Sequence, residues 1–169
     1  PFQHVSRGIV HAMNRKGDAK TYLSLVNRLR EAVPQIAIRS TFMTGFPGET
    51  DEQFEELLDF SVAARLDRVG AFTYSPEEGT RAASMDGEVD EKKKRARYER
   101  LMGVQKRVSA AKLAERVGSK VRVLVEEDTG DDTWIGRTEY DAPEVDGVIF
   151  LTGKDLRLNE IVTATVTDA

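Results

Sequence analysis

Cysteine is absent from all 169 residues of the sequence. Disulfides, a thiol nucleophile and a thiolate-bound metal are therefore excluded within these residues. Histidine is scarce as well, because only His4 and His11 are present. Two histidines seven residues apart, without a matching pattern of carboxylates, make a poor metal site. We expect no metal ligands in this sequence.

Long apolar runs are also missing. No run approaches the roughly 18 apolar residues that a membrane-spanning helix needs. The segment from Pro1 to Arg15 lacks the charged-then-apolar order of a signal peptide. The sequence is 40% hydrophobic and 32% charged, as in ordinary globular domains. These features predict a cytoplasmic protein that does not bind membranes.

The sequence also lacks an excess of positive charge, and its charged residues are unevenly distributed. The net charge is −4. Residues 117–169 carry five basic and twelve acidic side chains, a net −7, whereas residues 1–116 carry 20 and 17, a net +3. Binding to nucleic acid or anionic lipid is therefore not expected of the acidic part. Its expected partner is basic.

Apolar residues at helical spacing predict two helices in the first 35 residues. Ser6 is of a type that caps helices, and Gly17 is expected to end the first helix. Pro34 forces the chain out of the second. The expected inward-facing positions are Ile9, Val10, Met13, Tyr22, Leu25, Val26 and Leu29.

Strands and helices alternate in the following eighty residues. Continuous apolar and β-branched residues predict buried parallel strands at 36–44 and 68–74. Thr50 and Gln53 form a capping box for a helix between them, and Asp90 can cap a long charged helix. The expected inward-facing residues of these helices are Phe54, Leu57, Leu58, Val62, Tyr98, Leu101, Met102, Val108 and Leu113. This alternation predicts right-handed βα crossovers and an α/β fold.

The pattern changes to period two after Gly118, which is expected to end the long helix. Val121, Val123 and Val125 alternate with polar residues, and Gly130-Asp131-Asp132 is a hairpin signal. Further short strands are predicted at 133–140, 145–151 and 160–166. Short strands with tight turns are typical of a small antiparallel barrel. We predict two domains, residues 1–116 and 117–169.

The loops that follow the two buried strands are candidate binding sites, because ligands bind at the carboxyl ends of parallel strands. The first, Thr44–Thr50, has glycines at 45 and 48 that let the backbone approach a ligand or adopt positive φ. The second, Phe72–Thr80, has aromatic residues that can flank a planar ligand. Ordinary turns and core aromatics would explain either loop alone. Two such loops at adjacent strand ends favour a shared site.

Three further residues are candidates because of their positions. Gln3 and His4 stand just before the first helix, where the carboxyl end of a preceding strand is expected. Arg39 is a charge within a buried strand, and such a residue is usually paired or directed into a cavity. The run Glu91–Arg95 is interpreted as a solvated helix face, with contact to nucleic acid as the alternative.

Three segments together resemble, in order and spacing, the later part of the radical S-adenosylmethionine (SAM) domain of methylthiotransferases. They are Pro1–Ser6, Arg39–Thr50 and Phe72–Thr80. Residues 117–169 resemble the TRAM domain of the same enzymes. Asp141–Gly147 is similar to a segment of the RimO branch, which modifies an aspartate of a small-subunit ribosomal protein.

The resemblance implies the C-terminal part of an open, TIM-like radical SAM barrel, followed by an OB-like antiparallel TRAM barrel. The full-length enzyme would use SAM and two 4Fe-4S clusters to methylthiolate the β-carbon of an aspartate. The C-x-x-x-C-x-x-C motif of the SAM-cleaving cluster is absent here. We therefore expect no catalytic residue in this fragment, no cofactor bound by it, and no activity of the fragment alone.

The resemblance also implies which residues contribute to a SAM pocket. Those expected beside the methionyl or ribose portion are Gly45, Phe46, Pro47, Gly48 and Glu49. Tyr74 and Ser75 are expected near the adenine, and Arg39, Gln3 and His4 match family positions without an assigned contact.

Charge distinguishes the branches of the family. A branch that modifies transfer RNA would profit from a basic TRAM domain, because phosphate contacts dominate RNA affinity. The net charge of −7 in residues 117–169 instead favours docking of a basic small-subunit ribosomal protein on this domain. Two alternatives stay open: a transfer-RNA methylthiotransferase of the same family, and a nonenzymatic binding module that carries a TRAM domain.

Overall fold

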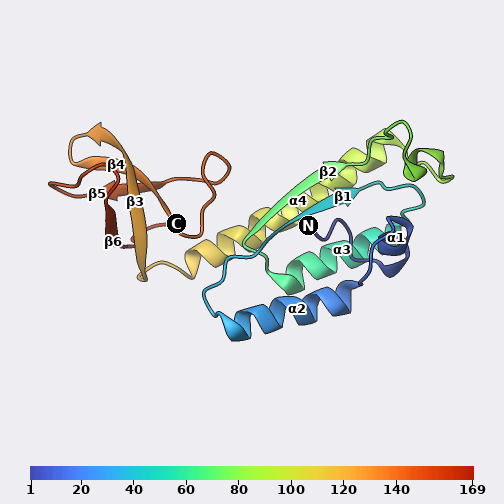
Figure 1. Cartoon of the computed structure of the whole chain (residues 1–169), viewed down its shortest axis with the longest axis horizontal. Helices are drawn as coiled ribbons and strands as arrows, with labels where there is room; N and C mark the ends of the chain where they lie inside the picture. Colours follow the sequence, from blue (N-terminus) through green and yellow to red (C-terminus); the bar gives the residue numbers. More distant parts are fainter. The chain divides into compact units, whose positions relative to one another are not determined.

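Two units with separate hydrophobic cores make up the structure, a computed structural model that describes all residues from 1 to 169. The first unit is Pro1–Lys112 and the second is Leu113–Ala169 (Figure 1). None of the helices is both long enough and apolar enough to cross a membrane.

The first unit is an α/β arrangement around a pair of parallel strands. In chain order its elements are α1 (Arg7–Ala12), α2 (Ala19–Ala32), β1 (Arg39–Thr44), α3 (Asp51–Ala64), β2 (Arg68–Thr73), the 3-10 helix η1 (Arg81–Ser84) and α4 (Glu91–Ala114). β1 and β2 pair in parallel register, and Gln3 adds a one-residue parallel bridge to Phe42. The predicted α/β class is confirmed.

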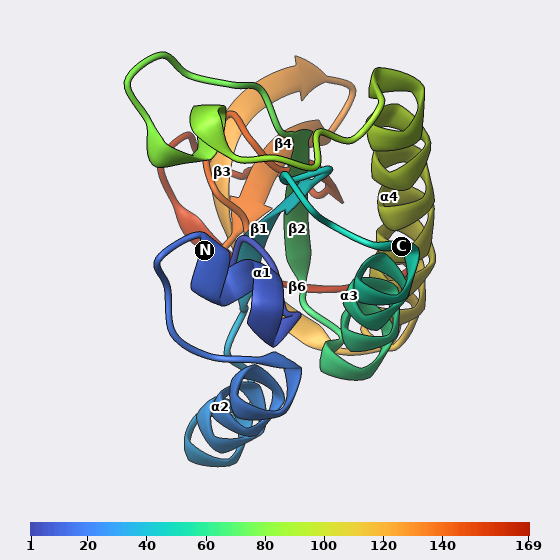
Figure 2. The ribbon, with the colours of Figure 1, turned by 90° about the vertical axis from the view of Figure 1, so that its right-hand side faces the viewer.

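The core of the first unit lies between β1 and the helices α2, α3 and α4. Its largest fully buried side chains include Phe42 of β1, Phe54 and Leu57 of α3, and Leu101 of α4. Figure 2 shows α3 and α4 on the same side of the two strands. Each such side chain contributes about 1.5–3 kcal/mol by leaving water. This packing fixes the strand ends relative to α4.

Two of the three predicted helix caps are confirmed. Thr50 and Gln53 form a reciprocal capping box at the start of α3. Asp90 Oδ1 accepts hydrogen bonds from the backbone N–H groups of Lys92 and Lys93 at 2.9 and 3.3 Å. Ser6 occupies the N-cap position of α1, but its hydroxyl makes no capping bond. The predicted Ser6 cap is therefore wrong.

Some predicted inward-facing positions are wrong as well. Leu25 and Leu29 of α2 are 43% and 37% exposed, and Val62 of α3 is 56% exposed, whereas Val26 is fully buried. α2 packs on the unit through one narrow stripe, so the flanking positions remain in solvent. The helix ends also differ. α1 ends at Ala12, before Gly17.

The second unit is a four-stranded antiparallel sheet of order β5-β4-β3-β6. Its strands are β3 (Lys120–Gly130), β4 (Thr133–Thr138), β5 (Ile149–Thr152) and β6 (Ile161–Thr165). α4 ends at Ala114 rather than near Gly118, whose N–H donates to Val166 O beside β6. The sheet fits the predicted small OB-like barrel.

The predicted hairpin and the predicted inner face of this sheet are both confirmed. Asp131 and Asp132 have φ values of 53° and 57° between the paired residues Gly130 and Thr133. Positive φ at both central residues is typical of the two-residue turns that match strand twist. Val121, Val123, Val125 and Leu151 are buried and form the core of the unit.

Candidate functional site

The carboxyl ends of β1 and β2 lie side by side and bring most of the candidate residues together. Tyr74, which follows β2, donates its N–H to the carbonyl of Thr44, the last residue of β1, at 2.8 Å. On the other side of β1, Gln3 N–H donates to Thr41 O at 2.9 Å, and Met43 N–H donates to Gln3 O at 2.7 Å. We call Gln3, His4, Thr44–Glu49 and Tyr74 the carboxyl-edge cluster.

Aromatic packing shapes one side of this cluster. The rings of Phe46 and Tyr74 meet edge to face, with centroids 5.4 Å apart and planes at 70°. Both side chains are buried and form a small core with Ile9 of α1. Such a pair adds about 0.5–1.5 kcal/mol to the energy of burial. It holds the loop after β1 against the end of β2.

Two buried polar atoms of the cluster have no hydrogen-bond partner in the chain. They are the Tyr74 hydroxyl, on a residue that is 7% exposed, and Gln3 Oε1. Gln3 also has a φ of 66°, which is uncommon for a residue with a side chain. Unsatisfied buried groups and local strain tend to occur at binding sites. Both atoms are therefore candidates for a polar partner from outside these residues.

His4 and Glu49 form a fully buried pair. His4 Nδ1 accepts the N–H of Ser6 at 3.0 Å, so neutral His4 carries its proton on Nε2. That Nε2 lies 3.4 Å from Glu49 Oε1. Glu49 Oε2 accepts the N–H of Gly45. The pair therefore ties the segment before α1 to the loop between β1 and α3, and both side chains are engaged inside the protein.

Arg97 of α4 completes this network from the other side. Its guanidinium is 3% exposed and lies 3.2 Å from the Glu49 carboxylate. It also donates to Glu49 O at 3.1 Å and to Asp51 Oδ1 at 2.7 Å. Hydrogen bonds from Lys93 and then from Arg97 hold the pKa of Asp51 below its ordinary value. One cation thus fixes both the loop and the first turn of α3.

Lys94 of α4 packs beneath the same loop. Its side chain is fully buried, and its Nζ pairs with Glu91 Oε1 at 2.5 Å and lies 5.5 Å from the Tyr74 ring centroid. Gly45 has a φ of +75°, and a Cβ there would lie 2.3 Å from Lys94 Cγ. Only glycine fits above this lysine. The interpretation of residues 91–95 as a solvated face is therefore wrong for Lys94.

The sequence patterns did not identify Arg97 and Lys94 as buried residues of the site, because charged residues are expected on the exposed side of a helix. Their spacing with Leu101 and Val104 nonetheless follows the helical period of a buried stripe, and all four are buried. Cations that continue an apolar stripe are a signal of buried ion pairs, because charged residues are rarely buried without partners.

A second loop covers the first. Gly48 N–H donates to Gly87 O at 2.8 Å, so the segment between β2 and α4 touches the loop after β1. A Cβ on Gly87 would lie 3.0 Å from Gly48 N. Both glycines have positive φ. The positive φ that the sequence suggested for Gly48 is thus confirmed, and its backbone closely approaches another part of the chain.

Two of the candidate residues are not part of the cluster, one because it is distant and the other because it is exposed. Arg39 begins β1 and pairs in register with Arg68. It lies five residues before Thr44, which places it roughly 16 Å away along the strand. Ser75 directly follows Tyr74 but is exposed. The structure therefore brings together Gln3, His4, residues 45–49 and Tyr74, without Arg39.

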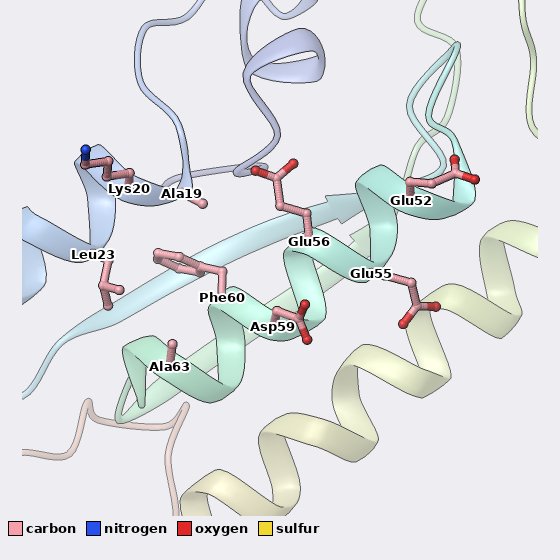
Figure 3. Close-up of a pocket in the computed structure, with 9 residues that line it drawn as sticks. All are labelled: Ala19, Lys20, Leu23, Glu52, Glu55, Glu56, Asp59, Phe60 and Ala63. Carbon is pink, nitrogen blue, oxygen red and sulfur yellow. The ribbon is translucent and has the colours of Figure 1, made fainter.

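A separate groove of about 640 Å³ lies between α2 and α3 (Figure 3). Leu23 and Phe60 contribute apolar surface, and the side chains around them are mostly acidic or small. The lining residues are Ala19, Lys20, Leu23, Glu52, Glu55, Glu56, Asp59, Phe60 and Ala63. None of the sequence-predicted residues lines this groove. It is distinct from the carboxyl-edge cluster.

Comparison with known proteins finds two family models that match separate parts of the chain. Residues 1–61 match the radical SAM superfamily, and residues 117–169 match the TRAM domain. Proteins named ribosomal protein uS12 methylthiotransferase RimO are similar over the whole chain. The chain matches part of a RimO-type methylthiotransferase.

Three RimO relatives illustrate the similarity, and each aligns with 100% of this chain. The protein of Vibrio vulnificus is 46% identical over 170 residues, that of Alteromonas mediterranea 47%, and that of Methylococcus capsulatus 45%. The chain spans 36%, 35% and 39% of their respective lengths. The predicted family and the order of its two folds, radical SAM followed by TRAM, are confirmed.

Proposed function

We propose that this chain is part of a radical SAM methylthiotransferase that modifies a small-subunit ribosomal protein. The observation that carries the proposal is the similarity of the entire chain, at about 46% identity, to proteins named for modifying ribosomal protein uS12. Its proposed functional parts are residues 1–116 and 117–169, with the second beginning where the TRAM match begins.

We infer that the carboxyl-edge cluster is one wall of the SAM pocket. The loop residues Gly45, Phe46, Pro47 and Gly48 would lie beside the methionyl or ribose portion, and Tyr74 would lie near the adenine. Glu49 and His4 would act indirectly, because their side chains are buried in bonds to the loop and to Arg97. The unpartnered Tyr74 hydroxyl and Gln3 Oε1 support this inference, because a polar ligand would satisfy them.

The chain's own residues bind and orient rather than transfer protons. When bound, SAM and an iron–sulfur cluster supply radical chemistry at the substrate. The clusters need ligands outside these residues, since the sequence has no cysteine and no group of three or more candidate metal ligands. The chain by itself would therefore be inactive.

The proposed substrate is the β-carbon of an aspartate in the ribosomal protein, which the TRAM part would bind by charge. Residues 117–169 have a net charge of −7. A basic ribosomal protein would be attracted and steered, whereas RNA would be repelled. Association should weaken as salt increases, because screening shortens the reach of these charges. Such a substrate places the reaction in the cytoplasm.

The activity is tested with the full-length protein carrying its clusters, supplied with SAM, a reductant, inorganic sulfide as the sulfur donor, and purified uS12. We expect one aspartate to gain a methylthio group, detected by mass spectrometry of uS12 peptides. Bulk transfer RNA in the same reaction is the control. Methylthiolation of RNA with none on the protein would instead assign the chain to the transfer-RNA branch.

The pocket is tested separately by Tyr74→Phe, which removes only the unpartnered hydroxyl. We expect SAM to bind roughly three- to tenfold more weakly, as for one lost hydrogen bond, while the thermal stability without ligand does not fall. Tyr98→Phe on α4 is the matched control. Equal SAM affinity of both variants and the wild type would remove Tyr74 from the pocket.

A further inference from the structure

The sheet of the second unit has two faces of different character. Val121, Val123 and Val125 cover the inner face and are buried. Large apolar residues are also found on the outer face, where Phe150 is 73% exposed and Ile161 is 55% exposed. Contiguous exposed apolar surface on a folded domain marks an interaction site.

Strand register places these residues on one face of the sheet as two offset pairs, with Arg137 opposite Leu124 and Glu127 opposite Ile135. Ile161 of β6 is directly opposite Leu124 of β3, and Phe150 of β5 is directly opposite Ile135 of β4. Directly opposed residues project from the same face of a sheet. Leu124 is also opposite Arg137, two residues from Ile135. We call Ile161, Leu124, Ile135 and Phe150 the outer row, which crosses all four strands.

Acidic residues border the outer row. Glu126 and Glu127 of β3 are exposed, and Glu127 is directly opposite Ile135. Glu160 is exposed and immediately precedes Ile161. Arg137, the basic residue within the row's span, is paired with Glu126 at 2.6 Å. The border is therefore acidic around an apolar centre.

We propose that the outer row is the docking surface for a basic segment of the ribosomal protein substrate, whose apolar side chains pack on Phe150 and Ile161. The inference rests on the proposed function and assigns its protein contact to one face. An apolar centre with a polar border is the usual anatomy of a protein interface. Lysine and arginine of the partner would meet the acidic border.

The acidic border of the outer row favours a basic protein segment over two other partners, a second copy of the chain and an RNA strand. A second copy of the chain would bring its own −7 domain against the same border, and like charges brought together oppose association. An RNA strand would bring phosphates to the same carboxylates, although an exposed phenylalanine can stack on bases. A basic protein segment complements both the row and its border.

The test measures uS12 binding by full-length variants Phe150→Ser and Ile161→Ser. We expect the dissociation constant to rise roughly 10- to 100-fold for Phe150→Ser, as for a buried aromatic contact. Val145→Ser is the matched control, because Val145 is 72% exposed but lies outside the row. It should change the dissociation constant by less than about twofold. SAM affinity should stay unchanged in all three.

The outcomes separate this inference from the proposed function. If the wild type binds uS12 and Phe150→Ser binds equally well, the outer row is not the docking surface. Protection of the Phe150 side chain from hydroxyl-radical footprinting in the full-length protein without partner would also overturn it, because another part of the same chain would then cover the row. Loss of RNA binding in Phe150→Ser would assign the row to RNA. A wild type that does not bind uS12 contradicts the proposed function itself.

Discussion

The two units differ in the kinds of side chain that they bury. The first buries His4, Glu49, Lys94 and Arg97 around one loop, and its apolar core lies beside them. The second buries three valines and a leucine, and its charged residues lie on the surface. Buried ion pairs are weak contributors to stability, but they hold their partners in a defined geometry. Buried charged residues thus fix the conformation of a loop in the first unit, whereas the charged residues of the second unit are on its surface.

Arg97→Gln tests the buried network and has the largest expected effect. It leaves the fully buried Glu49 carboxylate without its cation, and removing one partner of a buried pair costs about 3–5 kcal/mol. We expect that loss in the free energy of unfolding, together with faster hydrogen exchange in residues 45–51. Chemical denaturation and exchange mass spectrometry measure the two quantities.

Arg100→Gln is the matched control for Arg97→Gln. Arg100 is also on α4, also contacts the Phe54 ring and also pairs with a carboxylate of α3, Glu55, at 2.7 Å. Its side chain is 55% exposed, so we expect a loss below about 1 kcal/mol. Equal losses in the two variants would mean that the network around Glu49 only attaches α4 to α3.

Leu151→Ala tests the apolar core of the second unit. Leu151 is 5% exposed, and truncating a buried leucine costs about 2–5 kcal/mol. Its neighbour Phe150 faces the other side of the sheet, so Phe150→Ala should stay within about 0.5 kcal/mol of the wild type. Denaturation of both variants checks the difference. A large loss in Phe150→Ala would show that the outer row stabilises the fold.

Gly45→Ala tests the contact between the loop and Lys94. The added Cβ would clash with Lys94 Cγ at a residue with φ of +75°, and we expect a cost of about 2 kcal/mol from strain and overpacking. Gly48→Ala has a similar φ but nothing near its Cβ, so only the smaller strain should appear. Thermal unfolding ranks the two variants. Equal shifts in melting temperature would mean that the Lys94 side chain moves aside without a measurable loss of stability.

Asp51→Asn has the smallest expected effect, and its sign depends on pH. The pKa of Asp51 is lowered from 3.8 by Lys93 and Arg97, so its carboxylate stabilises the fold fully above that value. The contribution is lost as pH falls through the lowered pKa. We expect the variant to be slightly less stable at pH 7, and the gap to close in acid. Thermal unfolding from pH 7 to pH 2 measures it, and a gap that persists in acid would contradict the ion pairs.

Local signals in the sequence predicted elements whose partners are close along the chain. The capping box of Thr50 and the turn at Asp131 and Asp132 depend on neighbouring residues. The alternation of Val121, Val123 and Val125 identifies a buried face. The α/β order and the small β module follow from such patterns.

Features that depend on distant contacts could not be predicted in the same way. Ser6 occupies the N-cap position without a side-chain capping bond, and the exposure of Leu25 and Leu29 depends on how much of α2 is covered. Arg97 reaches Glu49 across 48 positions of sequence. Within the candidate site, the strand-end loops were found from topology, but the cations that shape them were not.

The contact between Gly48 and Gly87 couples the motion of two loops. A single backbone hydrogen bond of 2.8 Å joins them, donated by the amide of Gly48. That amide can exchange with solvent only when the bond opens. The exchange rate of one glycine amide, followed by nuclear magnetic resonance, would therefore report the fraction of time for which the segment between β2 and α4 is lifted from the strand ends.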